Sequence, residues 1–99
     1  MYSHRKDNEE ALGGVIERLL KAYGLEDGYY AAAMITHWEK MMGTAVARHT
    51  RELKLKDGVL TIKLESASLR QELSYAKEKI AERINQEFFP GLVKEVVLS

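Results

Sequence analysis

The chain has 99 residues, of which 45% are hydrophobic and 30% charged, and it contains no cysteine. These values indicate one globular domain over residues 1–99, and they exclude disulfides and thiolate metal sites. The 15 basic and 15 acidic residues give a net charge of zero, so a nucleic-acid surface would need its cations gathered on one face.

The first helix is predicted over residues 8–23. Apolar side chains recur in it at helical spacing: Leu12, Val15, Ile16, Leu19, Leu20 and Tyr23. Asp7 or Asn8 can cap its start, and Gly24 follows its last apolar position, where a left-handed C-cap favours glycine. The Gly13-Gly14 pair weakens this helix by roughly 1 kcal/mol per glycine relative to alanine. We therefore expect it to depend on packing against the rest of the domain.

The second helix is predicted over residues 29–42, and Gly43 ends it by the same logic. Its apolar stripe consists of Tyr30, Met34, Trp38, Met41 and Met42. Trp38 could offer its ring to a nucleic-acid base. Because its spacing matches the apolar stripe, we interpret it as a packing residue.

Two strictly alternating segments, residues 51–56 and 59–64, flank Asp57-Gly58, the strongest short-range signal for a hairpin. A two-residue type I′ turn here pairs Lys56 with Val59. One face of the hairpin is then apolar: Leu53, Leu55, Leu60, Ile62 and Leu64. The other face carries Glu52, Lys54, Lys56, Thr61 and Lys63. A slip of one residue would place the leucines in water, so the pattern specifies this register strongly.

A long third helix is predicted over residues 68–88, begun by Ser68 in a capping box or by Ser66 as a competing cap. One stripe runs along it: Leu69, Leu73, Ala76, Ile80, Ile84 and Phe88. The Phe89-Pro90-Gly91 sequence ends the helix.

Residues 92–98 form the last predicted strand, in which Lys94 and Glu95 indicate a partly solvated or edge position. The order helix, helix, strand, strand, helix, strand indicates an α+β two-layer sandwich with a three-stranded sheet. KH-like domains have a related arrangement. Their GXXG loop is absent, because Gly13-Gly14 lies in a predicted helix with the wrong spacing, so nucleic-acid binding cannot depend on that loop.

Three short motifs follow one another in a fixed order. Residues 37–50 contain a Trp, a Gly and an Ala-x-x-His-Thr run, residues 66–73 read Ser-Ala-Ser-Leu-Arg-Gln-Glu-Leu, and residues 83–85 read Arg-Ile-Asn. With the leucine-rich hairpin between them, this order resembles the DciA family of bacterial replicative-helicase loaders. The resemblance implies a KH-like domain, binding to DNA, and contact with the DnaB-type replicative helicase during its loading. Many members carry a basic or disordered extension, whereas this chain stops at Ser99, so the resemblance does not reach activities that depend on such an extension.

Basic residues at and before the hairpin, together with His49, are the candidate nucleic-acid contacts. They are Arg48, His49, Arg51, Lys54, Lys56 and Lys63. Arg51 could point toward the core and extend its charge to solvent, and the His49-Thr50 pair could instead orient the start of the first strand. The alternative interpretation is a solvated face whose lysines discourage edge pairing. Phosphate contacts position a strand without reading its sequence, so we expect weak, sequence-tolerant DNA binding.

Neither an enzyme nor a metal site is expected. His37 and His49 lack the three or four convergent ligands of a zinc site. Asp57 is explained by its turn and Glu72 by its position early in a helix. No nucleophile, phosphate-loop or metal motif appears, so we expect no cofactor.

The sequence is also compatible with two other functions. A protein-interaction module without nucleic-acid contact is favoured by the zero net charge. A KH-like RNA-binding protein is suggested by fold analogy alone. The N-terminus lacks the apolar stretch of a signal peptide, and no apolar run approaches the roughly 20 residues that span a bilayer. We therefore expect a cytoplasmic protein that does not associate with membranes.

Overall fold

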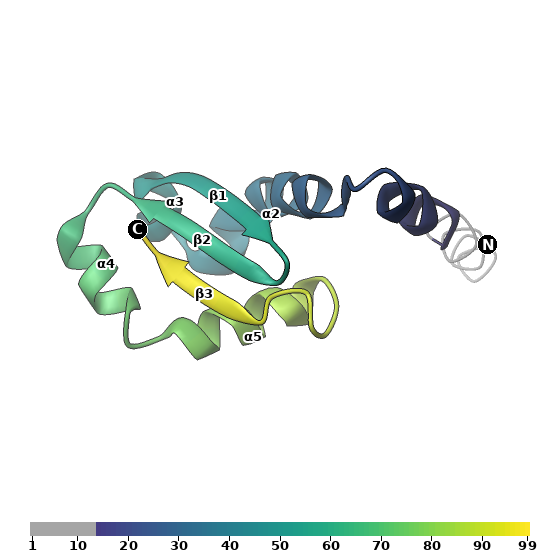
Figure 1. Ribbon diagram of the computed structural model, residues 1–99. Helices are drawn as coiled ribbons and strands as arrows, with labels where there is room; N and C mark the ends of the chain where they lie inside the picture. Colours follow the sequence, from purple (N-terminus) through teal and green to yellow (C-terminus); the bar gives the residue numbers. More distant parts are fainter. Residues whose placement is uncertain (1–13) are drawn as a thin grey trace, which may run out of the picture.

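A computed structural model describes residues 14–99 of the chain. Its elements are α2 (Glu26–Met42), α3 (Thr44–His49), β1 (Thr50–Lys56), β2 (Val59–Leu64), α4 (Ala67–Leu73), α5 (Lys77–Glu87) and β3 (Glu95–Leu98), and residues 14–22 form a further helix before α2. The three strands make one sheet, with α2 and α5 packed against it (Figure 1). The α+β architecture with a three-stranded sheet is the predicted one. The proposed caps Asp7 and Asn8 lie outside the described residues.

The hairpin register is the predicted one. β1 and β2 are antiparallel, with Lys56 opposite Val59 and Glu52 opposite Lys63, and β3 adds to β2 in parallel. Asp57 and Gly58 have φ values of 50° and 84°, since a type I′ turn needs positive φ at both central residues. The Asp27 carboxylate accepts the Asp57 backbone N–H at 3.1 Å, which ties the start of α2 to the turn.

The core lies between the apolar face of the sheet and the helices. All five predicted apolar side chains of the hairpin are buried, and so are Met34, Trp38 and Met41 of α2. Ile80 and Ile84 of α5 complete this cluster together with Leu92, Val93 and Val96 near β3. The opposite face of the sheet presents Lys54, Lys56 and Lys63 to solvent.

The helix at residues 14–22 ends at Gly24, as predicted, with φ of 68°. The N–H of Gly24 bonds the carbonyl of Lys21 at 3.2 Å, and that of Leu25 bonds the carbonyl of Leu20 at 2.8 Å, which is a Schellman C-cap. The expectation that this helix packs on the domain is wrong. Val15, Ile16, Leu19 and Tyr23 are exposed, Leu19 at 52%, and the segment extends away from the sheet (Figure 1). We call residues 14–25 the N-terminal arm.

The single helix predicted over residues 68–88 is wrong, because the structure divides it into α4 and α5 at a turn over residues 74–76. The Ser74 hydroxyl donates to the carbonyl of Gln71 at this break. A continuous helix of that length would extend about 30 Å, whereas the six residues of β2 span about 20 Å. The turn therefore lets both halves of the apolar stripe lie against the sheet. Ser66 caps α4 by accepting the N–H of Leu69 at 3.1 Å.

Smaller differences lie at the ends of elements. α2 begins at Glu26 rather than at residue 29, and the short helix α3 was not predicted. β3 begins at Glu95 rather than at residue 92, although Leu92 and Val93 are buried just before it.

Candidate nucleic-acid interface

The three candidate lysines of the hairpin share its exposed face. Lys54 and Lys56 are two residues apart on β1, so their side chains leave the sheet about 7 Å from each other. Lys63 stands on β2 directly opposite Glu52, which offsets part of its charge. The face can therefore contact a phosphate backbone through Lys54 and Lys56, with a weaker contribution from Lys63.

Arg51 does not point toward the core. The ladder is irregular between Thr50 and Glu52, which leaves Arg51 outside the pairing register, and such an irregularity redirects a side chain. The Arg51 guanidinium lies 3.0 Å from the Glu65 carboxylate, with 64% of its side chain exposed. An exposed pair of this kind stabilises the fold by at most about 1 kcal/mol, but it partly neutralises the charge that a phosphate would use.

Arg48 and His49 close the short helix α3 beside the first strand. Arg48 is exposed and His49 is half-buried. The carbonyl of His49 accepts the N–H of Glu65 at 2.9 Å, so the backbone at this position joins α3 to the end of β2. Of the candidate residues outside the strands, only Arg48 thus presents an exposed charge that has no ionic partner within residues 14–99.

Trp38 is a packing residue, as interpreted from its spacing. Its side chain is buried and its indole Nε1–H donates to the Thr50 hydroxyl at 2.9 Å, which in turn donates to the carbonyl of Val46 at 2.7 Å. This chain of hydrogen bonds joins α2, α3 and β1. In the His49-Thr50 pair the orienting role expected from the sequence is thus carried by the Thr50 side chain and the His49 backbone carbonyl.

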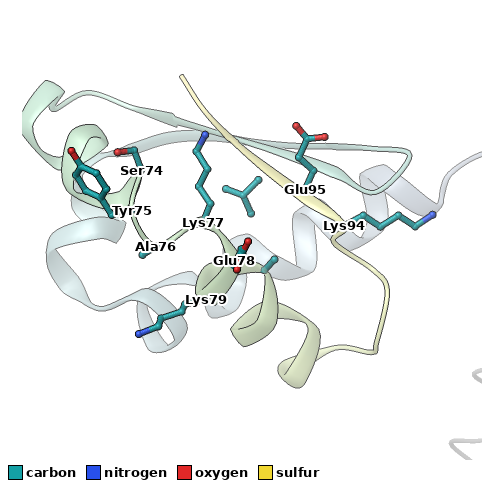
Figure 2. Close-up of a pocket in the computed structure, with 10 residues that line it drawn as sticks. Ser74, Tyr75, Ala76, Lys77, Glu78, Lys79, Lys94 and Glu95 are labelled. Carbon is teal, nitrogen blue, oxygen red and sulfur yellow. The ribbon is translucent and has the colours of Figure 1, made fainter.

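A second surface was not predicted from the sequence. A groove of about 550 Å³ lies between the α4–α5 turn and β3 (Figure 2). Three small or apolar side chains take part in its lining, those of Ala76, Ala81 and Val96. The other lining residues are polar or charged, so the groove suits a charged, hydrated ligand better than an apolar one.

Charged and aromatic side chains stand around this groove. Lys77 lies on the α5 side and Glu95 on the β3 side, and Glu78 of α5 also lines the groove (Figure 2). Tyr75 in the turn is 82% exposed, an arrangement suited to stacking on an unpaired base. The turn contains no glycine, so the glycine-rich clamp of KH domains is not present at this position.

The groove and the exposed sheet face adjoin at β3. Glu95 lines the groove, and in the parallel register it stands opposite Val59, whose antiparallel partner is Lys56. One extended ligand could therefore contact both surfaces. The sequence offered one signal for the groove: Tyr75 is an aromatic residue placed off the apolar stripe of its predicted helix.

Two other kinds of feature are absent from residues 14–99. No group of three or more His, Asp or Glu side chains is arranged there to hold a metal ion. In the same range no helix is long and apolar enough to cross a membrane.

In comparison with known proteins, the chain matches the sequence model of a protein family. The sequence model described as "Dna[CI] antecedent, DciA" matches residues 11–98. A UPF0232 protein of Corynebacterium glutamicum (strain R) is 25% identical over 87 residues, which cover 88% of this chain and 49% of that protein. A UPF0232 protein of Bifidobacterium longum (strain NCC 2705) is 33% identical over 55 residues, covering 56% and 35%. The chain thus spans at most about half the length of these relatives, and no solved structure matches it significantly.

Proposed function

The chain belongs to the DciA family, and on that premise we propose that it is a DNA-binding accessory protein of replication that recruits or loads the DnaB-type replicative helicase. The family is an accessory family of the helicase-loader type and is not known for catalysis. The protein therefore acts by binding, with no cofactor.

The observation that carries the DNA-binding part is the lysine-bearing face of the hairpin. Lys54, Lys56 and Lys63 are exposed on a rigid sheet whose register is fixed by the type I′ turn. Cations held in this way position a phosphate backbone and are indifferent to sequence. Because they are few and Glu52 stands among them, the affinity is weak.

The groove supports binding of single strands in particular. Tyr75 can stack on a base only when that base is unpaired. Its ring lies at the outer margin of the groove, and Lys77, two residues further along the chain, can contact a phosphate of the same strand. We propose that a single strand crosses β3, with its backbone on the lysine face and one base stacked on Tyr75 at the margin of the groove. Duplex DNA would use the lysine face alone.

The alternative functions predict different ligands. A protein-interaction module would bind the helicase and no nucleic acid, which the zero net charge favours. A KH-like RNA-binding protein would prefer an RNA oligomer to DNA of the same sequence, because the 2′-hydroxyl is the group that distinguishes them.

The deciding experiment measures two associations of the purified chain. Surface binding to purified DnaB-type helicase is expected at or below tens of micromolar (roughly 6 to 7 kcal/mol of binding free energy). Fluorescence anisotropy with labelled oligothymidylate, oligodeoxyadenylate and the matching RNA is expected to give similar, weak affinities for the two DNA strands. Folded protein that fails to bind the helicase contradicts the loader role, and failure with DNA alone leaves the protein-interaction module.

A further inference from the structure

Strand β1 forms one free edge of the sheet. The strand order is β1-β2-β3, so only β2 pairs with β1 within residues 14–99 (Figure 1). The Ile62 carbonyl of β2 accepts the N–H of Ser99, on the β3 side, at 2.9 Å. In an antiparallel ladder two opposite residues either both bond across the pair or both point outward, and Leu53 stands opposite Ile62. Leu53, and two residues later Leu55, therefore direct their N–H and C=O groups toward the free edge.

A small pocket lies beside this edge, between α2, α3 and β1. Its volume is about 190 Å³, and its apolar lining comes from Ile35, Trp38, Ala47 and Leu53, while the remaining lining residues are polar or charged. Trp38 and Leu53 are buried in the core, whereas Ile35 is 59% exposed. The pocket can therefore hold one aliphatic side chain that enters from outside the domain.

The other face of the same edge is basic. Lys54 and Lys56 stand on either side of Leu55 along the strand and lie on the exposed face of the sheet. A strand added to β1 would place one side chain opposite each lysine. Opposite charges at such positions stabilise the pairing, and like charges destabilise it. The two lysines thus discourage most strands from pairing here and favour one that carries carboxylates.

A second copy of β1 is a poorer occupant of this edge. A two-fold contact pairs the strand with itself, and the register centred on Lys54 places that lysine opposite the same lysine of the second copy. The register centred on Leu55 places Lys54 opposite Lys56. The register centred on Leu53 needs Arg51 in the ladder, where the strand is irregular, so the contact shrinks to a single residue pair. The charges and the backbone of β1 favour a strand of different sequence.

We propose that the free edge of β1 binds an extended segment of a protein partner as an additional antiparallel strand. The segment alternates acidic and aliphatic residues. Its carboxylates lie opposite Lys54 and Lys56, and an aliphatic side chain enters the pocket beside Ile35. Backbone bonds to Leu53 and Leu55 provide the affinity and the alternate side chains the specificity, as in other cases of strand addition. The inference goes beyond the proposed function and does not depend on it.

The direct test uses short synthetic peptides and the full chain. One peptide has the sequence Glu-Leu-Glu-Leu between serines, and the second has lysine in place of glutamate. Titrations followed by backbone amide shifts are expected to show binding of the acidic peptide, with the largest shifts in β1 and around Ile35. The basic peptide should bind at least about tenfold more weakly. Equal binding of the two peptides, no binding of the acidic one, or shifts confined to other elements would overturn the proposal.

Amide hydrogen exchange tests the backbone contact itself. In the free chain the N–H groups of Leu53 and Leu55 should exchange faster than that of Lys54, which faces β2. At a concentration of acidic peptide about ten times its Kd, exchange at the two leucines should slow by about tenfold. The same peptide with N-methylated leucines cannot donate to β1, so it should bind at least about tenfold more weakly. A methylated peptide that binds as well as the unmethylated one would exclude strand addition.

Variants locate the two faces of the contact. Ile35→Ser should weaken the acidic peptide by about fivefold or more, while Leu19→Ser, a change of an exposed apolar residue on the arm, should leave it unchanged. Lys54→Glu with Lys56→Glu should reverse the preference between the two peptides. An Ile35 variant that binds as the parent does, or a double reversal that keeps the preference, contradicts the strand site. A dimer in sedimentation that the acidic peptide dissociates would assign the edge to a second copy and also contradict it.

Competition with DNA separates this inference from the proposed function. The acidic peptide and oligothymidylate both require Lys54 and Lys56, so each should displace the other. If the peptide binds and DNA does not, the lysine face fails as a DNA contact and the strand site stands. If DNA binds and the peptide does not, the strand site fails and the proposed function stands. Simultaneous binding without displacement would place the peptide elsewhere and contradict the inference.

Discussion

Asn85 of α5 holds the backbone of Val93 by two hydrogen bonds of 2.9 Å each: its Nδ2 donates to the carbonyl, and its Oδ1 accepts the N–H. Val93 is buried, so its backbone groups would otherwise be poorly solvated. Lys94 and Glu95 follow directly and form one wall of the groove. The Asn of the Arg-Ile-Asn motif therefore positions the segment that leads into β3.

Replacing this side chain should destabilise the protein although it removes no apolar contact. Asn85→Ala leaves both backbone groups of Val93 without their partners, which costs about 1–3 kcal/mol. Gln86→Ala, a change of the exposed neighbour in the same helix, should stay within about 0.5 kcal/mol. Urea denaturation of both variants measures the difference. Equal free energies of unfolding would mean that the Asn85 bonds contribute nothing to the fold.

The two faces of the hairpin should respond unequally to truncation. Ile62 is fully buried and the adjacent Thr61 is partly exposed on the opposite face. Ile62→Ala should lower the free energy of unfolding by about 2–5 kcal/mol, because it removes buried methyl groups and leaves a cavity. Thr61→Ala should cost far less. Denaturant unfolding curves compare them, and similar losses at the two positions would contradict the burial assignment.

Whether a feature could be predicted from the sequence depended on the physical interaction that produces it. From Glu52 to Lys63 the hairpin register was predictable because the period of two and the Asp57-Gly58 turn each fix it independently, whereas the irregularity at Arg51 was not predicted. The break at residues 74–76 was not, because Leu69, Leu73, Ala76 and Ile80 keep the helical period across it. Periodicity shows which face of an element is apolar but not where its axis must bend to stay on a short sheet.

The two unpredicted surfaces have the same kind of explanation. The groove unites residues 74–81 with residues 94–96, and no local pattern relates segments so far apart in the chain. The arm carries a regular apolar stripe, from which burial was inferred. An apolar stripe identifies the face of the helix that is more stable when buried. It does not show whether that face packs on the same domain or on another molecule.

The hydrogen bond between Trp38 and Thr50 should be measurable by a double-mutant cycle. Trp38→Phe and Thr50→Val each interrupt the chain of bonds from Trp38 to Val46, and a typical bond of this kind contributes about 0.5–1.5 kcal/mol. The double variant should lose less stability than the sum of the two single variants, because both remove the same interaction. Strict additivity would indicate that the indole and hydroxyl are not coupled.

The same residue provides an optical control for DNA binding. Trp38 is the one tryptophan of the chain and is only 4% exposed. Since a buried indole cannot stack on a base, saturating oligothymidylate should leave its emission maximum unchanged. A strong quench with the fold intact would restore the stacking role that the packing interpretation rejected.

Tyr75 should discriminate between single strands and duplex. Tyr75→Ala should weaken binding of a single strand by about 1–3 kcal/mol, the contribution of one stacked base, and should leave duplex binding unchanged. Tyr75→Phe retains the ring and should bind as the parent does. Tyr23→Ala serves as the matched control, because Tyr23 is also exposed (73%) but lies on the arm. An equal loss for duplex and single strand would exclude stacking in the groove.

Charge reversal tests which cations hold the phosphate backbone. If roughly three to five phosphates are neutralised, the logarithm of the affinity should fall against the logarithm of salt concentration with a slope of about −2 to −4.5, spanning single strands and duplex. Reversing Lys54, Lys56 and Lys63 to Glu should abolish binding while the melting temperature changes little, because all three side chains are exposed. Salt titrations by fluorescence anisotropy give both the affinity and the slope.

The matched comparison reverses Lys77 and Lys79, which line the groove. Because the lysine face provides the larger share of the phosphate contacts, this double reversal should weaken single-strand binding less than the triple reversal does. The double reversal should weaken duplex binding still less, because a duplex has no unpaired base that could stack on Tyr75 and bring the strand to the groove. A triple variant that stays folded and binds DNA as the parent does would contradict the lysine face as the DNA contact. A double variant that loses more affinity than the triple one would move the main contact to the groove, which Lys77 and Tyr75 both line.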